Sequence, residues 1–228
     1  ILYSYTAQEA QALTELPANP THEGLTSQGW NYTLAQVKSE CTAVGGCTVG
    51  QMYITDDGAT RIYLNFSSDE AARLKPYLYL AVNGSVTVDW GDNSSGTTMA
   101  GSSLTSLTYA SHQYSEKGDY ILSITPRTDS TTFSFMTTST SSGSRFLRKK
   151  SGSETIGDQN GGFYYVNSVK KIELGSGAII GKYAFQDCYN LETITVPSTI
   201  SSIGERAFYS NEVLKAFIFS SSITTTSQ

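Results

Sequence analysis

The last third of the chain repeats itself every 23 residues, and no other feature of the sequence constrains the fold as strongly. The sequence IGKYAF at residues 180–185 returns as IGERAF at residues 203–208, and a weaker copy begins at Ile156. Further pairs at the same offset are Leu191 with Leu214, Ile194 with Phe217, Val196 with Phe219, and Ile200 with Ile223. A fixed period of this length predicts a solenoid, in which each copy stacks on the next and buries an apolar face.

Within each copy, a short strand is expected to direct three apolar side chains inward. These are Val169, Ile172 and Leu174 in one copy, Leu191, Ile194 and Val196 in the next, and Leu214, Phe217 and Phe219 in the last. The stacked strands then form a parallel ladder, with Phe163, Phe185 and Phe208 as an aromatic column in the core. Gly181 and Gly204 are expected where the chain turns tightly, because glycine adopts backbone conformations that other residues avoid.

The strand positions between the inward ones are the candidate ligand-binding residues. They form two predicted ladders, Lys171, Thr193 and Ala216 in one and Glu173, Thr195 and Ile218 in the other. Solenoids commonly bind partners on such a surface, although a solvated face without a ligand explains the same residues equally well. Ala216 and Ile218 make the last copy more apolar, which indicates burial under a further repeat, a cap or a neighbouring chain. Self-association at the solenoid end is therefore one expectation.

The first segment, residues 1–68, is expected to be a small α+β unit. Residues 32–44 have apolar side chains at helical spacing, with Thr33 as the cap and a Gly-Gly pair at 45–46 as the end. Residues 52–66 alternate around an Asp-Asp-Gly turn, which favours a β-hairpin.

Three cysteines do not define a disulfide framework. Cys41 and Cys47 either form a disulfide that closes a small loop or remain two ordinary thiols, and the sequence leaves both alternatives open. Cys188 occupies the repeat position of Asn211, which favours a packing or ladder role over a reactive thiol.

The second segment, residues 69–150, is expected to be a β-sandwich followed by a linker. Short β-patterned runs separated by Gly-, Asn- and Ser-rich turns are typical of that fold. The runs cover residues 77–82, 85–90, 104–109, 120–125 and 132–135. Residues 136–150 are rich in Ser and Thr and then basic, which favours an exposed linker or a hairpin tip. The third segment, residues 151–228, is the repeat array, so the fold class is mainly β and multidomain.

Charge argues against nucleic acid as a partner. The chain has a net charge of −5 and 15% charged residues, whereas broad nucleic-acid binding requires a basic surface. Its one basic run consists of Arg145, Arg148, Lys149 and Lys150. A nucleic-acid or heparin patch is the sharper interpretation of that run, and a solvated loop is the simpler one.

Sequence patterns give no sign of catalysis, a cofactor or a metal. No phosphate-binding loop, dinucleotide fingerprint or nucleophile elbow occurs. His112 with Asp89 and Asp92 is better explained as a turn, because aspartates commonly accept hydrogen bonds from turn amides. A calcium site of Asp89, Asp92 and Asn93 is too sparse to be expected.

We expect an exported chain. No stretch approaches 18 apolar residues, so no membrane insertion of this chain is expected. Ile1 is expected to be the start of a mature or trimmed chain from which any export signal has been removed.

The repeat resembles a known family. Ile-Gly-x-x-Ala-Phe, a Leu six residues after the Phe, and Ile-x-Val-Pro followed by Ile are similar to the BspA-like leucine-rich repeats of bacterial surface proteins. The resemblance implies a secreted or surface-anchored protein that attaches to host proteins, extracellular matrix or other cells.

The second segment resembles polycystic-kidney-disease (PKD) domains. The matching sequences are VTVDWGDN at residues 86–93, HQY at 112–114 and KGDYILSI at 117–124. This resemblance implies an immunoglobulin-like sandwich that serves as a spacer or binding module on extracellular proteins.

Together these observations predict a bacterial extracellular or cell-surface protein for adhesion or recognition. Its expected partner is a host or matrix protein or a glycan, and no reaction is expected to be catalysed. The alternatives are a structural spacer or assembly component of a phage or a surface, and an accessory domain of a glycan-acting enzyme.

Overall fold

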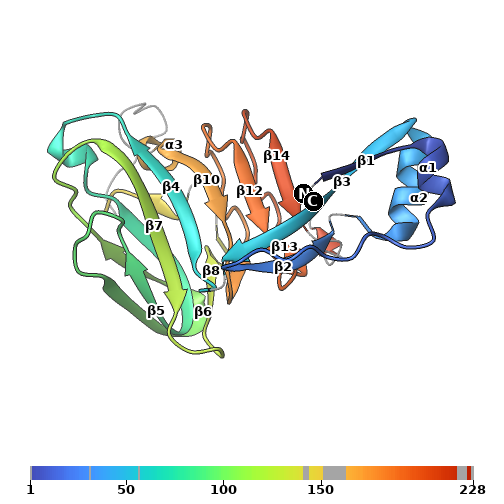
Figure 1. Cartoon of the computed structure of the whole chain (residues 1–228). Helices are drawn as coiled ribbons and strands as arrows, with labels where there is room; N and C mark the ends of the chain where they lie inside the picture. The colour runs from blue at the N-terminus through green and yellow to red at the C-terminus, as the bar shows by residue number, and fades with distance from the viewer. Residues whose placement is uncertain are drawn as a thin grey trace.

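The computed structural model describes the chain except residues 1, 31, 56, 141–143, 151–162, 220–224 and 227–228. It is mostly β, with a small three-stranded sheet near the N-terminus and a large sheet that curls round a core (Figure 1). The beginning of the faint upstream repeat at Ile156 lies outside the described residues. None of the helices in the described part has the length and hydropathy needed to span a bilayer.

The N-terminal unit has a core of its own. Its elements are β1 (Leu2–Thr6), α1 (Ala7–Ala12), β2 (Leu25–Trp30), α2 (Leu34–Ala43) and β3 (Gly46–Thr55). The three strands are antiparallel, with β3 between β1 and β2. Its buried side chains come from both helices and from the sheet, and they are Ala10, Trp30, Val37, Cys41 and Val49.

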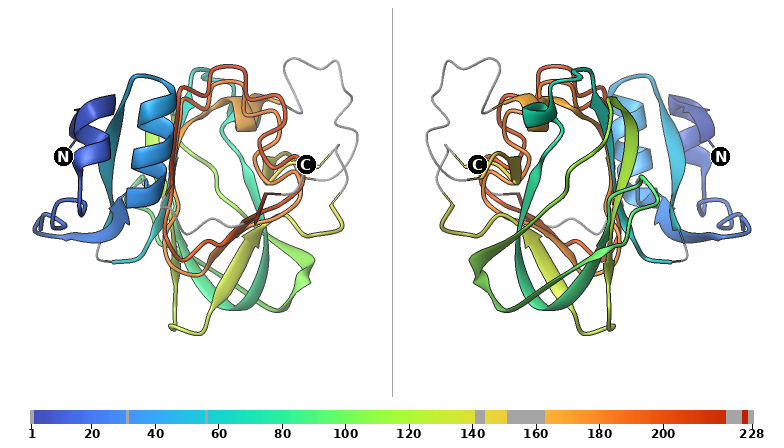
Figure 2. Two further views of the ribbon diagram at one scale, coloured as in Figure 1. Left: turned by 90° about the vertical axis from the view of Figure 1, so that its right-hand side faces the viewer. Right: turned by 90° about the vertical axis from the view of Figure 1, so that its left-hand side faces the viewer.

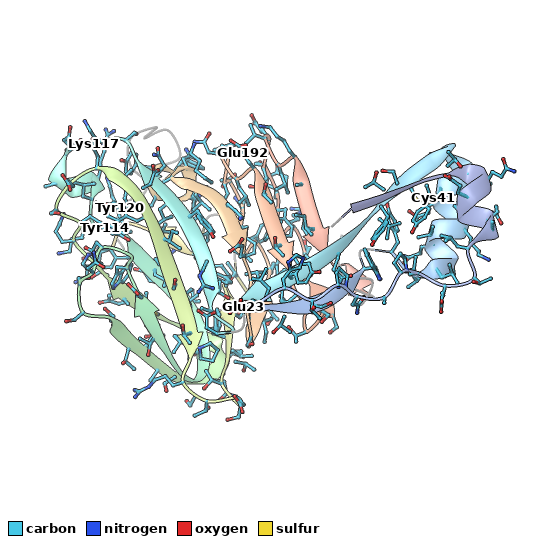
Figure 3. All side chains as sticks on the ribbon, in the orientation of Figure 1. Glu23, Cys41, Tyr114, Lys117, Tyr120 and Glu192 are labelled. Atoms are coloured by element: carbon cyan, nitrogen blue, oxygen red, sulfur yellow. A yellow bond between two sulfur atoms is a disulfide. The ribbon has the colours of Figure 1, made fainter. Side chains whose placement is uncertain are left out.

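Helix α2 begins and ends as predicted. The Thr33 hydroxyl accepts a hydrogen bond from the Gln36 amide (3.2 Å), and the Gln36 side chain accepts one from the Thr33 amide (2.8 Å). Gly45 follows the helix with a φ of +82°. Cys41 on α2 (Figure 3) forms a disulfide with Cys47 on β3, which settles the alternative that the sequence left open.

The hairpin predicted at residues 52–66 is wrong. Strand β3 pairs with β1 and β2, whereas β4 (Thr60–Phe66) pairs with β7 (Gly118–Pro126) and β10 (Val169–Glu173) of the large sheet. Every second side chain of β4 is buried in the core of that sheet. The alternation in the sequence therefore describes a strand correctly, but its partners are distant in the chain.

The large sheet runs across the predicted boundaries at residues 68 and 150. Its order is β14-β12-β10-β4-β7-β5-β8-β11-β13-β15, with β6 and β9 on β5. Besides β4 and β7, the strands between residues 69 and 150 are β5 (Tyr77–Asp89), β6 (Thr97–Ser111), β8 (Thr132–Phe135) and β9 (Leu147–Arg148). A short 3₁₀ helix, η1 (Ala71–Arg73), precedes β5. The runs predicted at 77–82 and 85–90 are one strand, β5.

Each copy of the repeat has two short strands. One joins a first parallel ladder and the other joins a second parallel ladder. After the short helix α3 (Tyr164–Asn167), the first ladder contains β10, β12 (Thr193–Val196) and β14 (Ala216–Phe219). The second contains β8, β11 (Ala178–Ile180), β13 (Ser202–Ile203) and β15 (Thr225–Thr226). Seen nearly along the stacking direction, the copies overlie one another (Figure 2).

The sequence period reappears as contacts between stacked copies. Lys182 and Glu205 form an ion pair at 2.8 Å, and Phe185 stacks on Phe208 with ring centroids 5.5 Å apart. Further pairs at the same spacing of 23 are Lys215 with Glu192, Arg206 with Tyr183, and Asn190 with the Asn167 carbonyl.

The predicted aromatic column is only partly correct. Beyond Phe208, the ring neighbours of Phe185 are Phe135 at 5.0 Å and Phe146 at 5.6 Å, and Phe163 lies elsewhere, 5.9 Å from Tyr189. The reason is that β8 precedes β11 in the second ladder, so the column continues into the segment that the sequence assigned to the sandwich.

The described parts of the segment 136–150, residues 136–140 and 144–150, are not the exposed linker that composition favoured. The Arg145 guanidinium pairs with Asp187, and both side chains are only 6% exposed. Arg145 also lies over the Phe163 ring, 4.0 Å from its centroid. Met136, Phe146 and Leu147 are fully buried. The segment therefore packs against the first full repeat, through Asp187 and Phe185, and is not surrounded by solvent.

The turn after β5 has the hydrogen bonds expected of its aspartates. Asp89 accepts from the Gly91 amide (2.9 Å), and Asp92 accepts from the Ser94 amide (3.1 Å). The His112 Nε2 atom lies 2.6 Å from Asp92, and its ring stacks on Trp90. Nearby Tyr114 and Tyr120 also pack together, with ring centroids 4.0 Å apart (Figure 3).

Gly181 and Gly204 have a different role from the one predicted. Neither has a positive φ, so a left-handed turn is not the reason for glycine. A Cβ on Gly204 would lie 2.4 Å from the Gly181 carbonyl carbon, and one on Gly181 would lie 2.6 Å from the Met136 carbonyl oxygen. The two glycines therefore allow the backbones of successive copies to approach closely.

Replacing Gly204 by alanine tests this close approach. We expect Gly204→Ala to lower the free energy of unfolding by about 1–3 kcal/mol, because the backbone of one copy must shift away from the next. Urea unfolding measures the change, with Ser201→Ala as the control at an exposed neighbouring position. Equal stability of the two variants would contradict the role given to Gly204.

Candidate ligand-binding surfaces

The six candidate residues lie in the register that the repeat predicts. Lys171 pairs with Thr193 and Thr193 with Ala216, while Glu173, Thr195 and Ile218 form the neighbouring row. The face is not uniformly open: the side chain of Lys171 is 40% exposed, Ile218 is 37% exposed as a residue, and Thr195 is only 9% exposed. The structure thus brings the six together, and their binding role stays a prediction.

Strand β4 extends this face by residues that sequence reasoning did not include. Tyr63 lies opposite Lys171, and Arg61 lies opposite Glu173. The Tyr63 hydroxyl donates to Glu173 (2.9 Å), and the Lys171 ammonium is 2.6 Å from the same carboxylate. The alternating pattern of residues 60–66 was the available signal, but placing those residues in the first segment separated them from the repeat.

Burial and the neighbouring Glu173 both affect the pKa of Tyr63 on the extended face. Burial, followed by the hydrogen bond that Tyr63 donates to Glu173 and the charge of that carboxylate, raises the pKa of Tyr63 to about 12. The Lys171 ammonium also lies 4.8 Å from the centroid of the Tyr63 ring. Tyr63, Lys171 and Glu173 therefore hold one another in a fixed arrangement on the outer face.

The N-terminal unit lies beside the first ladder (Figure 2). In Figure 1, β2 and β3 cross in front of the lower ends of the first-ladder strands. A large partner approaching the first ladder must therefore pass this unit.

Two adjoining grooves lie on the outer face of the second ladder. One has a volume of 440 Å³ and is bounded by Leu104, Ser134, Ile179 and the Lys182–Glu205 ion pair. The other, of 470 Å³, shares Ile179 and Ser202 with the first. Sequence reasoning did not identify these grooves. Strand β11 has only three residues, which is too short for an alternating pattern of apolar and polar side chains to reveal a strand.

The described side chains of the last copy are less buried than those of the copy before it. Leu214 and Phe217 are only partly buried against the core, whereas Leu191 and Ile194 in the preceding copy are fully buried. Tyr209 and Val213 are exposed. Both side-chain amide atoms of Asn211 are buried without a hydrogen-bond partner in the described part of the chain. Cys188, at the same position of the preceding copy, is fully buried with a raised pKa caused chiefly by burial.

Charge on Glu173 is expected to control the titration of Tyr63. In Glu173→Gln the pKa of Tyr63 falls from about 12 toward its ordinary value of 10, because the carboxylate no longer opposes ionisation. NMR titration of ¹³C-labelled tyrosine measures this pKa, with Tyr63→Phe to assign the signal. The control is Glu192→Gln, directly before β12 of the same ladder, which should leave the pKa of Tyr63 unchanged. A Tyr63 pKa near 12 in Glu173→Gln would contradict the arrangement.

Comparison with known proteins identifies the C-terminal part of the chain. Residues 154–228 match the family described as the BspA-type leucine-rich repeat region (6 copies). No curated protein and no solved structure matches the chain. The match supports the BspA-like resemblance for these residues and does not extend to the segment that resembles PKD domains. Residues 154–228 are thus similar to BspA-type leucine-rich repeats, and they supply β10, β12 and β14 of the first ladder and β11, β13 and β15 of the second.

Proposed function

We propose that the protein is a non-catalytic recognition or adhesion protein of the bacterial surface. In this proposal the repeat forms a short solenoid, the strands of residues 69–135 derive from a PKD-like sandwich, and a host or matrix protein or a glycan binds the outer sheet faces. The match to BspA-type repeats supports the surface location, because repeats of this type are typical of surface proteins. Export of the chain is part of the same proposal.

One observation carries the proposal. The outer face of β4, β10 and β12 presents regularly spaced polar side chains on a rigid hydrogen-bonded sheet, and β14 adds Ala216 and Ile218 beside them. Such a surface requires little ordering on binding, so the cost in conformational entropy is small. The ion pair and the hydrogen bond at Glu173 restrict the side chains further.

An array of glycans and extracellular-matrix proteins tests the recognition function with the intact chain. We expect a specific ligand, and we expect the combined substitution of Lys171, Glu173, Thr193 and Thr195 by alanine to weaken its binding roughly tenfold or more, which corresponds to about 1.4 kcal/mol. Binding constants for the selected ligand are then measured by surface plasmon resonance.

The control for the array is a double variant at exposed positions away from both ladders. Lys117→Ala with Glu70→Ala removes two charges there and should leave binding unchanged. Circular dichroism must show that the fourfold variant is folded. If no ligand binds, the recognition function is wrong; if binding survives the fourfold variant, the role of the first ladder is wrong.

The exposed and partly buried side chains of the last copy favour a second candidate, a component that assembles with a second copy of this chain. The partly buried Leu214 and Phe217, the exposed Val213 and the unpartnered Asn211 amide all lie in this copy. Among the described strands, β14 pairs with β12.

Assembly through the last copy predicts a mass that rises with protein concentration. Val213→Glu should shift the species toward the monomer, because it places a charge among the apolar side chains of that copy. Val44→Glu, at an apolar position with 76% exposure in the N-terminal unit, is the matched control and should leave association unchanged. Sedimentation equilibrium measures the masses. A monomer at every concentration, or equal effects of the two variants, would refute assembly through the last copy.

A further inference from the structure

A cluster of three tyrosines and one arginine lies on the outer face of β5, β6 and β9. Tyr77 is opposite Arg148 of β9, and Tyr79 is opposite Tyr109 of β6. The Tyr109 ring is 5.7 Å from that of Tyr77 and 5.4 Å from that of Tyr79, measured between centroids. The Arg148 guanidinium lies 3.8 Å from the Tyr79 ring centroid. These four residues are called the tyrosine–arginine patch.

The polar side-chain groups of this patch form no hydrogen bond or ion pair with the described residues. Arg148 forms no ion pair in the described part of the chain, and its Nε atom is buried without a hydrogen bond. By contrast, Arg145 three residues earlier is paired with Asp187. The side-chain hydroxyls of Tyr77, Tyr79 and Tyr109 also bond to no described residue. The guanidinium therefore has donors that the described residues leave unused, and an external acceptor that reaches its terminal nitrogens would use them.

We propose that the tyrosine–arginine patch binds an acidic sugar, a saccharide whose ring carries a carboxylate. The guanidinium offers a planar set of donors that fits a carboxylate with two parallel hydrogen bonds. The half-exposed Tyr109 ring provides an apolar surface for the C–H face of the sugar, and the hydroxyls of Tyr77 and Tyr109 match its hydroxyl groups. The buried Tyr79 ring supports the Arg148 guanidinium. This inference rests on the proposed recognition function and names a site and a ligand class for it.

The surroundings favour a sugar over a protein partner. A protein partner is usually anchored by a side chain that fills a desolvated pocket, and neither groove on the second ladder is lined by a tyrosine of this patch. The cations Lys149 and Lys150 follow Arg148 directly, so the local charge is positive on a chain whose net charge is −5. An anionic ligand is therefore attracted to this part of an otherwise acidic protein.

The next row of the sheet leads from the patch toward the groove of 440 Å³. The sheet register places Leu107, Ala81, Ser134 and Ile179 in one row across β6, β5, β8 and β11. Ser134 and Ile179 line the groove, together with Leu104 of the irregular part of β6. In a longer glycan, the acidic residue occupies the patch and the following sugars extend along this row.

Titration with simple sugars tests the patch. The probes are the methyl glycosides of N-acetylneuraminic acid and glucuronic acid, with methyl galactoside as the neutral sugar, and ¹³C-labelled tyrosine NMR detects binding. We expect the acidic sugars to shift the Tyr109 and Tyr77 signals and to bind at least about tenfold more tightly than the neutral one. Arg148→Ala should remove this preference, and Arg148→Lys should restore part of it, because lysine keeps the charge but not the planar pair of donors.

The matched control is Arg73→Ala in η1, which removes a cation 5.3 Å from the centroid of the Tyr164 ring and should leave acidic-sugar binding unchanged. Equal binding of acidic and neutral sugars, or a preference that survives Arg148→Ala, would overturn the proposal. Tyrosine shifts in the unsubstituted protein report the contact even if a variant fails to fold. If the array finds a protein ligand and the acidic sugars cause no shift, the patch is wrong and recognition stands. If the acidic sugars bind the patch and the array finds no ligand, the site stands and host adhesion is wrong.

Discussion

The hydrogen-bonding edges of the first repeat copy are the constraint on which the rest of the structure depends. A parallel ladder leaves one row of backbone amides and carbonyls unpaired at each end, and such an edge must be covered or exposed to other chains. Here β4 pairs with β10 and β8 pairs with β11, so both ladders begin on strands from outside the repeat. Because β4 and β8 are themselves joined through β7 and β5, the sheet must curl round one core.

This arrangement gives each outer surface a mixed origin. On the first ladder, Tyr63 of β4 holds Glu173 of β10 in place. On the second, Ser134 of β8 lies beside Ile179 of β11 and bounds a groove together with Leu104 of β6. The strands that complete the repeat therefore also supply aromatic, charged and hydroxyl groups at the positions where a ligand would bind. Neither surface exists in the repeat alone.

The sequence predicted the features that depend on near neighbours or on a fixed period. The capping box of α2 is local, and the register of Lys171 with Thr193 follows directly from the period. Pairing between distant segments could not be predicted in the same way, because the alternation of residues 60–66 specifies two faces of a strand but not its partner. Composition wrongly predicted that Arg145 is exposed. A basic and polar run can also contain a buried arginine when the carboxylate that pairs with it, here Asp187, comes from another segment.

The tyrosine–arginine patch shows the same limit for the candidate site. Its members come from three strands, and no spacing in the sequence relates Tyr77, Tyr109 and Arg148. The candidate residues of the first ladder were accessible to sequence reasoning only because repetition converts distance along the chain into position in space. Sites that combine unrelated strands become visible when the register is known.

The pairs of side chains separated by 23 residues have a consequence for how such a chain can change in length. Each copy contacts its neighbours through equivalent groups, as Lys182 does with Glu205 and Phe185 with Phe208. Insertion of a whole copy between two others would recreate every one of these contacts, whereas insertion of a single residue would put all later groups out of register. Duplication in whole units is therefore the change that this architecture accommodates. It would place the last copy farther from β4 and β8, while the surfaces built on those two strands would stay as they are.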